Sequence, residues 1–255
     1  MSEPEIIRFE HVRKAFGPQK VFDDLSLGIR HGEIITLMGG SGCGKSVLLK
    51  MILGLLDWDA GAVIIDGDDI SGWGERQMLP VRRKVGMVFQ NGALFDSLSV
   101  FENIAYPLRE RGTSDRKLLT ARVTEVLEMV GLPGIEEKMP AELSGGMRKR
   151  VSLARAVAEV PKVLLYDEPT TGLDPVNVRR INELIISLRE KLQTTSVVVT
   201  HDLPSAYMVS DRLAMIANGR IIAVDDTASF RHNQDPTVQE FLTAMDVEPI
   251  RSHRA

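Results

Sequence analysis

Short apolar runs alternate with longer segments of helical period along this 255-residue chain. Five of the runs are strand-length and almost continuously apolar, as expected for parallel strands that are buried on both faces. They lie at residues 34–38, 85–89, 163–166, 196–200 and 213–217. Because helical segments separate these runs, the pattern predicts an α/β fold with a mostly parallel core sheet.

The N-terminal part has a different pattern. Residues 6–12 alternate weakly between apolar and polar positions, and residues 21–29 have the composition of a second early strand. We expect these two to form an antiparallel patch. A further strand with a turn is expected at residues 63–67, and an edge strand at residues 220–224.

Residues 100–158 are helical in pattern, with breaks at residues 112–114 and 133–134. This stretch predicts a helical insertion between two strands of the core sheet. Other helices are expected at residues 45–56, 176–192 and 237–245. The predicted organisation is one domain over residues 6–242, a helical subdomain within it at about 91–160, and a C-terminal tail at 243–255.

Residues 39–46 fit the pattern G-x-x-x-x-G-K-[ST] between a predicted strand and a predicted helix. Glycines allow backbone amides to surround phosphate oxygens, and the helix start adds its positive end. We expect Lys45 to contact the β- and γ-phosphates and the Ser46 hydroxyl to bind Mg²⁺. The nucleotide-binding residues predicted here are Gly39, Gly40, Ser41, Gly42, Cys43, Gly44, Lys45 and Ser46.

Polar residues follow three of the predicted core strands. Asp167 ends one strand and Glu168 comes next, Gln90 follows another, and His201 follows a third. In open α/β sheets, ligands bind at the carboxyl ends of the strands. We therefore expect Asp167 to hold Mg²⁺. Taken alone, Gln90 and His201 are ordinary polar residues.

Residues 143–147 read Leu-Ser-Gly-Gly-Met and have the pattern of a helix start with a serine cap. The next three residues, 148–150, are all basic, although positive charge opposes the dipole of a helix start. An anion facing them would relieve that cost. The alternative is a solvated basic face, which is the interpretation we adopt for Lys149.

A phosphate loop, then Leu-Ser-Gly-Gly, then a strand ending in two acids, in that order, resembles the ATP-binding cassette ATPases from about residue 6 to 242. The resemblance implies ATP hydrolysis with Mg²⁺. It makes Glu168 the general base, brings Gln90 to the metal and the attacking water, and brings His201 to the γ-phosphate.

The resemblance also implies a site shared between two copies of the chain. Ser144, Gly145 and Gly146 of one subunit would close over the nucleotide held by the other, which makes the ATP-bound state a homodimer. Asp174 would lie in a loop that crosses this interface, although Asp-Pro is also an ordinary helix start. Phe16 would stack on adenine, the alternative being core packing.

Met147 stands where most family members have glutamine, and Lys149 where they have a second one. Together with residues 91–100 and 105–110, this resembles the phospholipid-trafficking (MlaF-type, Mce-associated) branch. That branch implies a pair of membrane permease subunits, an Mce-domain lipid-binding protein and a small regulatory subunit as partners. Five residues would line the groove that receives the permease, unless they pack the helical insertion instead: Leu94, Phe95, Leu98, Phe101 and Tyr106.

Two other functions stay open. One is a motor for amino-acid import or lipoprotein release, and the other is a regulatory ATPase that controls a cell-wall hydrolase without moving a substrate. A formal net charge of −4 gives no reason to expect nucleic acid as a partner. The apolar runs are too short to span a bilayer, the first residues do not resemble a leader, and Cys43 is the single cysteine. We expect a soluble protein that is peripheral to the cytoplasmic side of the inner membrane.

Overall fold

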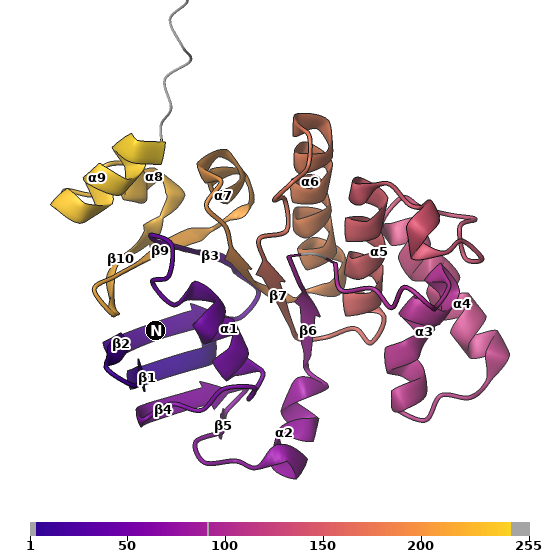
Figure 1. Ribbon diagram of the computed structural model, residues 1–255, viewed down its shortest axis with the longest axis horizontal. Coiled ribbons are helices and arrows are strands. Elements are labelled where there is room, and N and C mark those ends of the chain that lie inside the picture. The colour runs from indigo at the N-terminus through magenta and orange to yellow at the C-terminus, as the bar shows by residue number, and fades with distance from the viewer. Residues whose placement is uncertain (1–3, 91, 246–255) are drawn as a thin grey trace, which may run out of the picture.

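The computed structural model describes residues 4–90 and 92–245. At its centre lies a six-stranded sheet (Figure 1). In spatial order its strands are β10 (Arg220–Asp226), β9 (Arg212–Ala217), β3 (Ile34–Met38), β8 (Thr195–Val199), β7 (Val163–Asp167) and β6 (Val85–Val88). All neighbours pair in parallel except β10, which pairs antiparallel with β9 at one edge. The mostly parallel core sheet and its terminal edge strand are therefore confirmed.

A second, antiparallel sheet carries the N-terminal part of the chain. Its strands, in order, are β2 (Gln19–Arg30), β1 (Glu5–Phe16), β4 (Ala60–Ile65) and β5 (Asp68–Asp69). Each pairs antiparallel with its neighbour. The predicted antiparallel patch is confirmed, and the strand expected at residues 63–67 joins it as β4.

The core sheet is covered on both faces, and this explains its nearly continuous apolar strands. In β7, Leu165 faces the antiparallel sheet and α1 (Lys45–Ile52). Its neighbours Leu164 and Tyr166 face the opposite layer, which contains α6 (Pro175–Leu192). All three are fully buried. Burial of one such side chain contributes about 1.5–3 kcal/mol, so alternate residues of one short strand join two cores.

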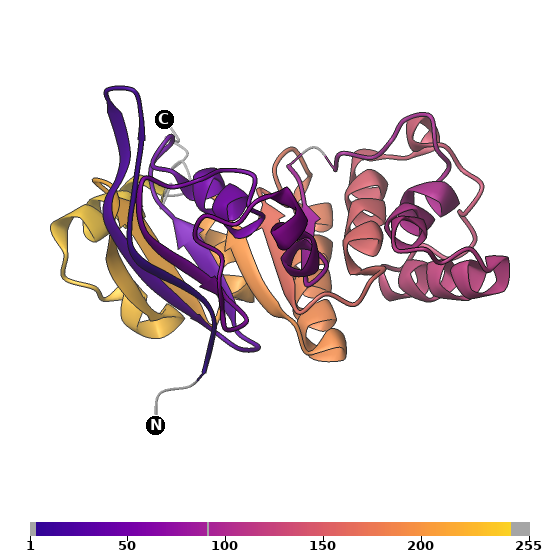
Figure 2. The ribbon, with the colours of Figure 1, turned by 90° about the horizontal axis from the view of Figure 1, so that it is seen from below.

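Three helices from the middle of the chain, α3 (Val100–Glu110), α4 (Arg116–Met129) and α5 (Gly145–Val157), pack together. Figure 2 shows them at the opposite end of the molecule from the antiparallel sheet. The first break falls where expected, since Gly112 has φ of 91°, whereas α4 ends at Met129, a few residues before the expected break at 133–134, where Gly131 has φ of 66°. Positive φ favours glycine and ends the regular helix.

Several helices differ from the prediction. The sequence did not indicate α2 (Glu75–Arg82), α7 (Leu203–Val209) or α8 (Thr227–Arg231), which have between five and eight residues. Such segments are too short to show a helical period. The first core helix ends at Ile52 rather than at residue 56 because Gly54 adopts φ 58°.

The last described helix is α9 (Pro236–Met245), close to the predicted 237–245. The tail at residues 246–255, for which a contact with a second subunit was considered, lies outside the described residues. Among the helices that the structure describes, none combines the length and the apolar character that crossing a membrane requires.

Candidate functional site

The phosphate loop lies between β3 and α1, and two of its glycines are required by their surroundings. A Cβ at Gly39 would lie 2.4 Å from the carbonyl oxygen of Ile216, and one at Gly44 would lie 2.6 Å from the ring of Phe22. Both glycines also have positive φ, 144° and 106°. The loop therefore follows a close path that other residues would obstruct.

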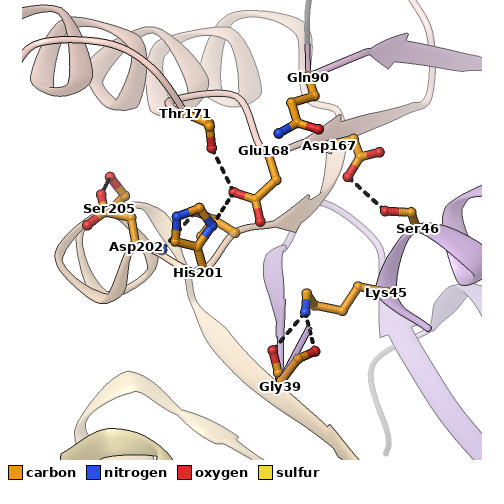
Figure 3. A network of polar contacts seen from close by, with 12 residues as sticks. Gly39, Lys45, Ser46, Gln90, Asp167, Glu168, Thr171, His201, Asp202 and Ser205 are labelled. Carbon is orange, nitrogen blue, oxygen red and sulfur yellow. Dashed lines mark hydrogen bonds and ion pairs between the residues drawn. The ribbon is translucent and has the colours of Figure 1, made fainter. Parts of the chain in front are cut away.

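Lys45 folds over its own loop (Figure 3). Its ammonium group donates hydrogen bonds to the carbonyl oxygens of Gly39, at 2.7 Å, and Gly40, at 3.0 Å. It also lies 3.7 Å from the Cys43 sulfur. These are weak acceptors compared with a phosphate oxygen, so a bound nucleotide would draw this side chain to a charged acceptor.

Strand register brings the polar residues that follow the core strands to one edge of the sheet. Val88 of β6 pairs with Tyr166 of β7, and Asp167 pairs with Val199 of β8. Gln90 and His201 follow two residues after these strand positions. The edge predicted from the sequence is thus formed from three neighbouring strands, and Figure 3 shows the side chains gathered there.

Asp167 faces the phosphate loop. The Ser46 hydroxyl donates to its carboxylate over 3.1 Å. Oxygen donors of this kind are the ligands that Mg²⁺ prefers, and the two residues come from elements that are far apart in sequence. The donor chemistry of the pair therefore fits a magnesium ion bound beside phosphate.

Glu168 points away from Asp167, toward His201 and Thr171. Its carboxylate oxygen Oε2 lies 2.9 Å from Nδ1 of His201 and accepts a 3.1 Å hydrogen bond from the Thr171 hydroxyl. The Glu168 backbone has φ 50°, which costs a residue with a side chain about 1–2 kcal/mol. This turn separates the directions of the two adjacent acids, and strain of this kind is often found at functional sites.

A buried polar chain lies behind His201, and sequence reasoning missed it. Asn182 of α6 donates to the Ser205 hydroxyl at 2.7 Å, and Ser205 donates to the Asp202 carboxylate. Asn182 and Ser205 are both nearly inaccessible to solvent. The chain connects α6 to the loop that carries His201. The Asn182–Ser205 contact spans 23 residues and leaves no local signal, which is why no pattern indicated it.

The start of α5 lies elsewhere. Ser144 caps the helix by accepting from the Met147 amide at 3.3 Å. A Cβ at Gly146 would lie 2.7 Å from the side-chain oxygen of Asn177, so this start packs beside the first turn of α6. Figures 1 and 2 show β6 and β7 between α5 and α1. Within the part of the chain that the structure describes, these two strands thus separate α5 from the helix that follows the phosphate loop.

Asp174 caps α6, as its position before a proline predicted. Its carboxylate accepts from the amides of Val176, at 3.0 Å, and Asn177, at 3.1 Å. The hydrogen bond from the Asn177 side chain is the largest of the effects that hold the pKa of Asp174 below its usual range. The residue is therefore an ionised helix cap beside the start of α5.

The basic residues 148–150 do not form one solvated face, so the expectation for Lys149 is wrong. Lys149 is 7% exposed, and its ammonium group donates to the backbone carbonyls of Gln90 and Glu168. Burial lowers the pKa of Lys149, and the negative charges of Glu168 and Asp167 partly oppose this. Arg150, also buried, donates to the carbonyls of Val130 and Gly131 and so does not face an anion.

Phe16 ends β1 at the hairpin to β2. It is 47% exposed, so core packing does not explain it. The Lys14 ammonium group lies 5.2 Å from its ring centroid. The same hairpin continues into Val21 and Phe22, which surround Gly44 of the phosphate loop. An exposed ring on a hairpin that packs against a phosphate loop can stack on a base.

An apolar groove of about 350 Å³ lies between the core sheet and the helical region. Phe89, Phe95 and Tyr106 line it and are each at least 40% exposed, and the last two rings lie 4.9 Å apart. The prediction for Phe101 is wrong: it is buried in the core of the helices, with Leu94 packed against that core. The helical period of α3 places Phe101 on the face that packs into this core.

Comparisons with known proteins agree on one family. The sequence model of the family described as ABC transporter matches residues 22–171, more than half of the chain. The intermembrane phospholipid transport system ATP-binding protein MlaF of Haemophilus influenzae is 40% identical over 235 residues, which are 92% of this chain and 89% of that protein. The probable ribonucleotide transport ATP-binding protein mkl of Mycobacterium leprae is 37% identical over 244 residues, 96% of this chain and 70% of that protein.

The fold has solved counterparts. The ATP-binding cassette MJ0796, solved as a dimer in a post-hydrolysis state bound to ADP and Pi, superposes with a TM-score of 0.79 at 32% identity. The match covers 87% of this chain and 98% of that one.

Proposed function

The chain belongs to the ABC transporter family, and on that premise we propose that it is the ATP-hydrolysing subunit of a membrane transporter that moves phospholipid between the inner and outer membrane. The observation that carries the proposal is the 40% identity to MlaF over nearly the whole of both chains. The name of mkl mentions ribonucleotides instead, but this chain spans only 70% of that protein. ATP hydrolysis itself follows from the family.

Residues at the sheet edge would divide the chemistry. Ser46, Gln90 and Asp167 would hold Mg²⁺, which supplies charge neutralisation at the phosphates. Lys45 would bind the β- and γ-phosphates, helped by the amides of the surrounding loop. Glu168, which points away from the Ser46–Asp167 pair, would act as the general base, its carboxylate accepting a proton from water.

His201 would bind the γ-phosphate while it contacts Glu168. Its Nδ1 lies 2.9 Å from Glu168, which leaves Nε2 as the ring nitrogen that would face a phosphate oxygen. The buried chain through Ser205 and Asp202 would keep this loop in place. Phe16 would stack on the adenine.

The second half of the site would come from another copy of the chain. The Ser144–Gly146 segment supplies helix-start amides that suit a phosphate, yet it lies away from its own phosphate loop. Beside it, an open groove of about 740 Å³ runs along the turn that contains Asp174 and includes His201. Val176 and Met208 are 68% and 42% exposed on this side. An apolar, hollowed face of this kind suits a homodimer that closes on ATP.

The groove lined by Phe89, Phe95 and Tyr106 would receive a permease subunit, one per copy of this chain. Docking there would hold the protein at the cytoplasmic face of the inner membrane. An Mce-domain lipid-binding protein and a small regulatory subunit complete the proposed assembly. The proposed ATPase unit comprises residues 6–242 with a helical subdomain at about 91–160.

The test is affinity purification of the full chain from its native membranes, followed by protein identification and lipid analysis. We expect a permease pair, an Mce-domain protein and phospholipid. A Tyr106→Asp variant, which places a charge in the groove, should lose all three. An exposed change elsewhere, Leu118→Asp, should retain them. Recovery of a division protein or of nucleotide-importing partners instead would contradict phospholipid transport.

A further inference from the structure

Lys149 connects elements that the proposed mechanism uses separately. It lies on α5, five residues after the Ser144 cap, and points into the core rather than toward solvent. Its ammonium group donates to the backbone carbonyl of Gln90 and, at 3.3 Å, to that of Glu168. One side chain thus joins the helix that would face the partner's nucleotide to the two loops that carry the proposed metal ligand and general base.

A charged side chain at position 149 costs free energy that an apolar side chain in the same place would not. A buried ammonium group loses hydration, and an apolar side chain would fill the same space without that loss. The charge is compensated by the two carbonyl oxygens and by the Asp167 and Glu168 carboxylates nearby. All of these compensating groups belong to the loops of the proposed catalytic site.

Arg150 provides a contrast within the same helix. It is equally buried and also donates to two backbone carbonyls, those of Val130 and Gly131. Those carbonyls lie at the end of α4, inside the helical region. Arg150 therefore holds helices together, whereas Lys149 holds α5 against the catalytic edge of the core sheet.

We propose that Lys149 is a positioning residue for ATP hydrolysis, which sets the placement of Gln90 and Glu168 relative to α5 by holding their two backbone carbonyls. The proposal rests on the roles proposed above for these two residues. Through this contact, closure of the α5 start on the nucleotide of a second subunit is transmitted to the general base of its own subunit. The ammonium group acts through these two carbonyls rather than on the reacting atoms.

The test compares substitutions in the full-length protein by steady-state ATPase assays, fluorescent-ATP binding and thermal melting. Lys149→Met removes the donors and should lower kcat by roughly tenfold or more, since small misplacements of reacting groups have effects of this size. The dissociation constant for ATP should change less than about twofold, because the phosphate loop is untouched. Lys149→Arg should restore most of kcat, and Lys149→Gln, a shorter neutral donor that matches the common family pattern, part of it.

The matched control is Arg150→Met. A purely structural role for Lys149 would make both Met variants lose melting temperature alike, with equal kcat per folded molecule. That equality would overturn the proposal, as would a Lys149→Met protein with normal kcat or a Lys149→Arg protein as slow as Lys149→Met. Glu168→Gln is measured in parallel. If that variant still hydrolyses ATP normally, the catalytic assignment itself has failed; if it is inactive while Lys149→Met is normal, only the positioning role is wrong.

Discussion

The edge of the core sheet and the start of α5 differ in how complete they are within one chain. At the sheet edge, Ser46 contacts Asp167 and His201 contacts Glu168, although these residues are up to 121 positions apart. At the start of α5, the Ser144 hydroxyl accepts from the Met147 amide and so caps its own helix. One region is assembled by strand register, and the other presents helix amides with no ligand from its own subunit. The difference supports the proposal that an ATP site is shared between two copies of the chain.

The largest expected effect comes from substituting the proposed general base at the sheet edge, the half of the site that is assembled within one chain. Glu168→Gln keeps the shape of the side chain but cannot accept a proton, so ATP turnover should fall by about a hundredfold or more while ATP still binds. Because the nucleotide persists, the variant should dimerise when ATP is added. Phosphate release measures the turnover and light scattering the dimer. Normal turnover would remove Glu168 from the mechanism, and a monomer with and without ATP would argue against the shared site.

Alkylation of Cys43 tests whether the assembled half binds nucleotide by itself. Its sulfur lies inside the loop, 3.7 Å from the Lys45 ammonium group. A maleimide adduct there has no room beside a phosphate, so alkylated protein should lose measurable ATP binding, and bound ATP should protect the thiol. Mass spectrometry follows the labelling. A Cys43→Ala protein treated in the same way should keep its affinity, and alkylated protein that still binds ATP would refute the expectation.

The start of α5 should behave in the opposite way. Ser144→Ala removes a hydroxyl that would face the other subunit's nucleotide at each of the two sites of the homodimer. ATP-dependent dimerisation of the Glu168→Gln protein should therefore weaken about a hundredfold, as for loss of two hydrogen bonds to charged groups. ATP binding by the single chain should not change. Ser99→Ala is the matched control, since Ser99 caps α3 with the same geometry, accepting from the Glu102 amide at 3.2 Å. If both variants lose dimerisation equally, the loss comes from helix capping alone.

The sequence predicted the residues of the assembled half because the carboxyl ends of parallel strands meet at one edge whatever the intervening chain does. That rule, together with the family resemblance, was enough to predict Gln90, Asp167 and His201. The failures share a different cause. Lys149 and Phe101 were misjudged because their surroundings come from other elements: Lys149 meets carbonyls from two distant loops, and Phe101 meets a helical core.

The smallest effect concerns the rim of the assembled half. Phe16 is exposed and already holds the Lys14 ammonium group near its ring, so stacking on adenine has to compete with that cation. Phe16→Ala should raise the dissociation constant for ATP by roughly fivefold, which corresponds to about 1 kcal/mol, the lower end of base–aromatic stacking. Phe16→Tyr should keep the affinity, and GTP should weaken as much as ATP because stacking reads no base edge. Titration of fluorescent ATP and GTP measures these dissociation constants, with Leu118→Ala as an exposed apolar control. An unchanged affinity in Phe16→Ala would leave this ring outside the site.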